Sequence, residues 1–116
     1  MITLVPNNTE RVDLSVFSPD TQAHATAVAG VTLIVRVAAS STATGALHAS
    51  LNYTATAYAS LAVAPPHYYV DILGVDIAAA VTAGAAVYDT AYVLQVIEGT
   101  TVTAYTNVYV RRTRKL

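Results

Sequence analysis

The chain has 116 residues, a length that sets an expectation of a single domain over residues 1–116. With 54% hydrophobic and only 11% charged residues, the composition excludes a disordered, charge-rich chain. The lack of cysteine excludes disulfides, thiolate metal sites and cysteine nucleophiles. Residues 1–10 lack the regions of a signal peptide, and no apolar run approaches the ~20 residues of a membrane helix, so we expect no membrane partner.

Charge is distributed unevenly along the sequence. The net charge is −1, yet residues 1–110 carry two basic against seven acidic residues. The remaining basic residues are Arg111, Arg112, Arg114 and Lys115. We expect this basic tail, residues 111–116, and an N-terminal extension over residues 1–9 to reach neighbouring proteins. Nucleic acid is not the expected partner, because a solvated chain end, or docking onto an acidic neighbouring protein, is the favoured explanation of these four basic residues.

Alternating β-branched and apolar residues predict strands in the first half of the chain. The first expected strand covers residues 10–17, with Val12 facing the core and Asp13 facing outward. Residues 31–38 are apolar on nearly both sides, which predicts a central strand. Residues 46–64 alternate again but are too many for one typical strand, so we expect a bend or bulge there.

A pair of prolines at 65–66 breaks this pattern, and residues 67–73 follow as a further expected strand. One short helix is expected near residues 76–83. Asp76 would cap its N-terminus, and Gly84 would end it in a left-handed conformation.

Residues 88–97 and 102–111 predict the clearest hairpin, joined by residues 98–101. We expect the inward-facing residues of its two strands to pair with each other. They are Tyr92, Leu94 and Val96 on the first strand and Val102, Ala104, Val108 and Val110 on the second. Residues 89–92 resemble the tyrosine corner of immunoglobulin domains, in which a Tyr hydroxyl bonds to upstream backbone. About seven strands at this spacing predict an all-β, Ig-like, antiparallel two-sheet sandwich, with a small barrel or jelly roll as the alternative.

The expected surface is poor in charge. A free-standing sandwich usually covers its outer faces with Lys, Glu and Arg, which oppose edge-to-edge association. Here the outer positions hold Thr, Ala, Asn and Tyr, and Tyr is enriched at interfaces. We therefore expect a homo-oligomer or a component of a larger assembly. The candidate contact residues are Tyr58, Tyr105 and Tyr109 together with Arg111, Arg112, Arg114 and Lys115.

Candidate chemistry is sparse. His24, His48 and His67 are far apart in the sequence, and none lies in a known metal-binding pattern. There is no G-x-S-x-G nucleophile motif, and the five glycines stand alone, which excludes a Gly-rich phosphate loop. We expect no catalytic residue, no metal and no cofactor.

Three stretches carry a resemblance to a group of known proteins. They are VTLIVRVA, HYYVDILGVDI and AYVLQVIEGTTVTAYTNVYVRR, within residues 31–111. Their order resembles small β-sandwich proteins of tailed-bacteriophage particles. The resemblance implies a structural virion protein, assembled in the host cytoplasm and bound to major capsid, tail or portal proteins.

The length of the chain favours a capsid decoration, or cement, protein over a neck, tail or fibre-base (baseplate) adaptor, which would usually carry a second segment. Two other interpretations stay open. One is a carbohydrate-binding module with Tyr rings as stacking platforms. Sugar sites usually combine an aromatic ring with Asp, Asn or Arg, whereas the expected neighbours of these Tyr rings are Thr and Ala. The other is a bacterial cytoplasmic protein-binding domain.

Overall fold

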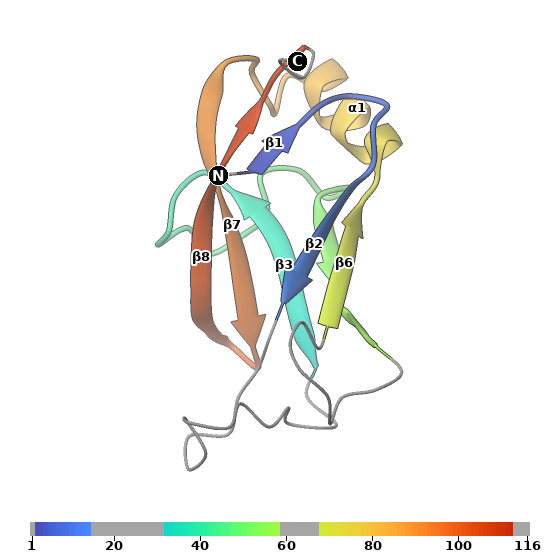
Figure 1. Cartoon of the computed structure of the whole chain (residues 1–116). Coiled ribbons are helices and arrows are strands. Elements are labelled where there is room, and N and C mark those ends of the chain that lie inside the picture. Colours follow the sequence, from blue (N-terminus) through green and yellow to red (C-terminus); the bar gives the residue numbers. More distant parts are fainter. Residues whose placement is uncertain (1, 15–31, 59–67, 113–116) are drawn as a thin grey trace.

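The computed structural model describes residues 2–14, 32–58 and 68–112. These residues form a two-sheet β-sandwich with one short helix, which confirms the expected fold class (Figure 1). The five-stranded sheet has the order β1 (Ile2–Leu4), β8 (Thr101–Val110), β7 (Thr90–Glu98), β3 (Leu33–Ala38), β4 (Asn52–Thr54). The three-stranded sheet has the order β2 (Glu10–Leu14), β6 (Tyr68–Ile72), β5 (Thr56–Ala57).

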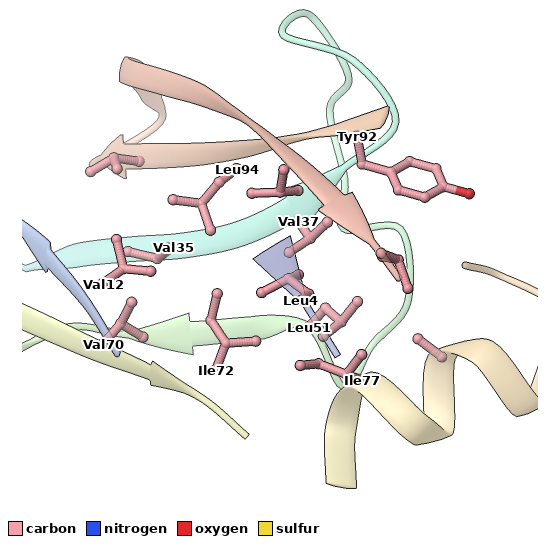
Figure 2. Packing of buried hydrophobic residues seen from close by; sticks show 14 of the residues in the cluster. Leu4, Val12, Val35, Val37, Leu51, Val70, Ile72, Ile77, Tyr92 and Leu94 are labelled. Atoms are coloured by element: carbon pink, nitrogen blue, oxygen red, sulfur yellow. The ribbon is translucent and has the colours of Figure 1, made fainter. Parts of the chain in front are cut away.

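The core lies between the inner faces of the two sheets. Figure 2 shows Val35 and Leu94 of the five-stranded sheet facing Val12, Val70 and Ile72 of the three-stranded sheet. Odd positions of β3 point inward and even positions of β2 and β6 do so, as period-two alternation requires. β3 lies between β7 and β4, so its expected central place is confirmed.

Helix α1 (Gly74–Thr82) covers one end of the sandwich and buries Ile77 and Ala80 (Figure 1). It begins two residues before the expected start, and Leu73 is its N-cap residue, with no side-chain hydrogen bond. The expected capping role of Asp76 is therefore wrong, because its carboxylate accepts a hydrogen bond from the Tyr53 hydroxyl at 2.7 Å. Gly84, just past the helix, has a φ of +76°, which confirms the expected left-handed end.

The first residues of the chain belong to the fold. Residues 2–4 pair in parallel with residues 108–110 of β8, and Leu4 and Val5 are buried. The expectation of an N-terminal extension over residues 1–9 is thus wrong for the described residues 2–9. A run of four residues before Pro6 was too short to predict a strand, and its partner lies at the far end of the sequence.

The closing hairpin is confirmed, but its pairing differs from the expected one. Val96 pairs with Ala104 and Ile97 with Val102, so Thr103 is an extra residue in a β-bulge. The bulge turns Val102 to the same outer face as Ile97. The other inward positions pair Tyr92 with Val108 and Leu94 with Thr106.

Residues 46–58 do not form one long strand. β4 pairs with β3, and β5, only one residue later, pairs with β6 in the other sheet. Ala55 lies at the crossing point and its N–H donates to the Leu33 carbonyl at 2.9 Å. The expected bend is confirmed as a switch between sheets. Residues 59–64 and 15–17 of the expected strands lie outside the described residues.

Candidate interaction surfaces

Strand β8 has an open edge over most of its length. β1 pairs with it only at residues 108–110, and no other described strand pairs with that side of β8. Residues 101–107 carry no charge, and all but the half-buried Val102 are exposed. Tyr105 is 63% exposed, as expected for an outward position. A strand edge of this length without Lys, Glu or Pro is a template for pairing with another strand.

The backbone bonds at the end of β8 show which residues present polar groups to this edge. The Asp89 N–H donates to the Val110 carbonyl at 2.7 Å, on the β7 side, whereas the Arg111 N–H donates to the Leu4 carbonyl at 2.9 Å, on the β1 side. Backbone groups alternate between the two sides of a strand. Tyr105 and Asn107, which share the parity of Arg111, therefore direct their N–H and C=O groups to the open edge.

An apolar groove of about 240 Å³ lies beside this edge, between the two sheets. Its lining residues are Ile2, Val12, Asp13, Leu14, Leu94, Val96, Ala104, Tyr105 and Thr106. Ala104 and Thr106 face inward yet remain exposed, and they line the groove together with Val12, Asp13 and Leu14 of β2. The sandwich described is thus open along β8.

Tyr58, the third candidate tyrosine, lies in a different place. Its hydroxyl donates to Asp13 Oδ1 at 2.6 Å, and its ring lies 4.8 Å from the ring of Tyr69, on the outer face of the three-stranded sheet. Arg11 covers Tyr69, with its guanidinium carbon 4.1 Å from the ring centroid, and forms a two-point ion pair with Asp71 at 2.8 and 2.9 Å.

This outer-face cluster shifts the protonation of its members. The hydrogen bonds from Arg11 lower the pKa of Asp71, because they stabilise its charged form. The hydrogen bond to Asp13 raises the pKa of Tyr58. The expectation that Thr and Ala surround the exposed tyrosines is wrong for Tyr58, since its neighbours come from strands distant in sequence.

The candidate residues near the C-terminus contact the chain's own surface. Arg111 lies 3.4 Å from Asp89 Oδ1 and 5.0 Å from the centroid of the Tyr109 ring. Arg112 lies over Tyr88, 4.5 Å from the ring centroid. Tyr109 is half-buried beside β1, unlike Tyr105. Arg114 and Lys115 lie outside the described residues.

The outer face of the five-stranded sheet holds a buried polar network that the sequence reasoning missed. Gln95 is fully buried, and its Nε2 lies 3.0–3.1 Å from the carbonyl oxygens of Ser40, Ser41 and Ala43. Arg36 Nε donates to Gln95 Oε1 at 2.7 Å. The loop after β3 is therefore fastened over the sheet. A single Gln within the apolar run of β7 was the available signal.

No protein-family model, curated protein or solved structure matches the chain.

Metal and membrane features were sought in the same residues. Residues 2–14, 32–58 and 68–112 hold no group of three His, Asp or Glu side chains that could bind a metal ion. His48 Nδ1 lies 2.7 Å from Ser50 Oγ, while His24 and His67 lie outside those ranges. Within the same ranges, no helix has the length and apolar character needed to span a bilayer.

The tyrosine-corner prediction is borne out at the level of one bond. The Tyr92 hydroxyl accepts a hydrogen bond from the Val87 N–H at 2.9 Å, and the ring is buried. Figure 2 shows the hydroxyl at the edge of the core cluster, directed away from Leu94. The bond ties the segment after α1 to the start of β7.

Proposed function

We propose that this chain is a structural protein of a tailed-bacteriophage particle, that it decorates the capsid, and that it acts through protein–protein contacts. The observation that carries the docking role is the uncharged, exposed edge of β8 at residues 101–107. The virion setting is supported by the order of strand, loop, helix and hairpin in residues 31–111, which resembles small phage β-sandwich proteins.

The chemistry of the β8 edge fits a surface that is covered in its working state. Tyr105 adds a large rigid ring, and the neighbouring Thr and Asn side chains can hydrogen-bond without the desolvation cost of a charge. The adjoining groove offers apolar contact to side chains of an added strand. A docked protein would therefore gain both backbone bonds and apolar burial at one site.

A carbohydrate-binding role is the second candidate, and the outer-face cluster is the observation that favours it. Tyr58 and Tyr69 lie beside Arg11, Asp13 and Asp71, the residue types that sugar sites combine. However, Arg11 covers one side of the Tyr69 ring and Tyr58 contacts it as well, so that ring offers little free face for stacking. Binding on a glycan array that is lost in Tyr58→Ala would favour this candidate.

Quantitative mass spectrometry of purified particles tests the virion proposal. A shell-decorating protein should be present in far more copies than a ring of subunits holds, and a neck, tail or fibre-base adaptor in about six to twelve. The copy number of the major capsid protein in the same sample provides the reference. Absence of the chain from the particles would overturn the proposal and favour a cytoplasmic or sugar-binding role.

A further inference from the structure

We propose that two copies of this chain pair antiparallel through their β8 edges, over residues 101–107, with a two-fold axis at Ala104. The inference rests on the proposed function, because it names a second copy of the chain as one of the proteins that this edge binds. The pairing would join the two five-stranded sheets into one continuous sheet.

The position of β1 sets the register. β1 occupies the space beside β8 at residues 108–110, so a second strand can lie along β8 only up to Asn107. At the other end, β8 begins at Thr101. Two antiparallel strands lie alongside each other over this whole free stretch only if its centre, Ala104, lies opposite Ala104 of the second copy. A centre nearer Asn107 would bring each strand against the other copy's β1, and a centre nearer Thr101 would extend past the start of β8, so either shift shortens the overlap.

The side chains of this stretch are compatible with themselves. In this register Thr103 lies opposite Tyr105 of the other copy, and no charged residue lies within residues 101–107 of either strand. Beyond the bulge Val102 faces outward whereas Thr106 faces inward, so regular cross-strand pairing ends at the bulge. Like charges on facing strands would destabilise the pair. The two Tyr105 rings lie on diagonal positions, which aromatic side chains can bridge.

Charge elsewhere on the molecule directs association to this edge. Residues 1–110 carry two basic against seven acidic residues, whereas residues 99–110 carry none. Among the described strands, β2 lies at one edge of the other sheet and bears Glu10, Arg11 and Asp13. Charged side chains on an edge strand oppose the addition of another strand, whereas residues 101–107 of β8 carry none.

The β-bulge at Thr103 is the opposing consideration, because a bulge increases strand twist and can turn an edge away from other strands. In the proposed pair both copies carry the bulge one residue from the axis, so their twists match. If the bulge instead prevents another strand from pairing with β8, the chain will stay monomeric.

The natural chain has no cysteine, so a single introduced one reports the register. Ala104 directs its backbone toward β7, so facing Ala104 residues would form a non-hydrogen-bonded pair with Cα atoms about 4.5 Å apart. That spacing suits a disulfide, which spans about 4.4–6.8 Å. Ala104→Cys should form a covalent dimer on mild oxidation. In the matched variant Asn107→Cys the two thiols would lie about 20 Å apart, so this variant should form no covalent dimer.

Equal cross-linking of Ala104→Cys and Asn107→Cys, or none in either, would overturn the proposed register. Sedimentation velocity tests the pairing without a cross-link. The natural chain should show a concentration-dependent dimer, and Tyr105→Lys should lose it because two cations would face each other across the axis. Val75→Lys adds the same charge at a residue 67% exposed on α1 and should keep the dimer. Circular dichroism confirms that each variant is folded.

The two proposals fail separately. A chain that is monomeric at every concentration, yet abundant in purified particles, overturns the β8 pairing and leaves the virion role. A dimer with the predicted cross-link, from a chain that is absent from particles, supports the pairing and overturns the virion role.

Discussion

Gln95 is the single buried polar side chain in the described part of the chain, and it makes four hydrogen bonds, three to carbonyl oxygens of the loop after β3 and one to Arg36 of β3. Its amide hydrogens are shared among three carbonyl oxygens, and its own oxygen accepts from Arg36. Because every polar atom of the amide has a partner, burial is compatible with stability. The Ser40 carbonyl also accepts from the Ala43 N–H at 3.3 Å, and the Ala43 carbonyl also accepts from Arg36 Nη2 at 3.3 Å.

Replacing Gln95 by Leu keeps the approximate volume and removes all of these bonds. We expect Gln95→Leu to lower the free energy of unfolding by about 2 kcal/mol, because four hydrogen bonds are lost and one of them is to the charged Arg36. Ile97→Leu, at a buried position on the same face of β7, should cost less than about 1.5 kcal/mol. Urea unfolding measures both. Equal losses in the two variants would mean that the network adds nothing to stability.

Gly74 is required by a close backbone approach. A Cβ atom at this position would lie 2.3 Å from Asn7 C and from Asn8 N, in the turn after β1. The Asn7 N–H donates to the Gly74 carbonyl at 2.9 Å, and the Gly74 N–H donates to the Thr9 hydroxyl at 3.1 Å. The turn and the start of α1 are therefore held in contact from both sides.

Two opposite effects compete in Gly74→Ala. Ala favours a helix over Gly by about 1 kcal/mol, but the added methyl collides with backbone, and such overpacking costs about 1–3 kcal/mol. Since backbone at 2.3 Å must move, we expect a net loss of unfolding free energy. Gly45→Ala is the control, because its Cβ would meet open space. If both variants are as stable as the natural chain in urea, the turn does not pack on α1 as described.

At the scale of elements, the ion pair between β2 and β6 makes stability depend on pH. Arg11 lowers the pKa of Asp71 below its unfolded value, so the pair stabilises the fold at pH values above about 4 and loses its effect as the pH falls through the lower folded pKa. Both side chains are partly exposed, which keeps the effect small.

Arg11→Gln should therefore lower the thermal midpoint at neutral pH, and its difference from the natural chain should narrow in acid. The difference in thermal midpoint that remains in acid measures the loss of the Arg11 contact with the Tyr69 ring. Asp71→Asn is the control, because in its background the effect of Arg11→Gln should no longer depend on pH. A difference that stays constant from pH 7 to acid would contradict the role of the ion pair.

Local pattern predicted some elements well and could not predict others. The faces of β2 and β3, the existence of β6, the helix with its Gly84 end, and the hairpin follow from alternation and turn residues within one segment. The short strand β1, the sheet switch at Ala55 and the bulge at Thr103 depend on partners far away in sequence. The surroundings of Tyr58 were missed for the same reason, whereas the exposure of Tyr105 follows from its strand alone.

At the scale of the whole molecule, the two ends of the chain meet in one sheet. Leu4 is fully buried beside Val110, so the core is incomplete until the first strand pairs with the last. The same pairing limits the open edge of β8, because β1 covers residues 108–110 and leaves residues 101–107 free. The N-terminus thus contributes both to stability and to the shape of the proposed docking edge.

Leu4→Ala tests this dual role. Truncating a fully buried Leu usually costs about 2–5 kcal/mol, and we expect a loss in that range. Thr3→Ala, on the other side of the same strand, should cost much less because Thr3 is only half-buried. Hydrogen exchange supplies the second measurement: Leu4→Ala should speed exchange at Arg111, whose N–H bonds to the Leu4 carbonyl, more than at the Val37 N–H, which bonds to the Leu51 carbonyl. Uniform acceleration at both amides would mean that β1 does not open separately, and that residues 108–110 stay covered whenever the rest of the sheet is formed.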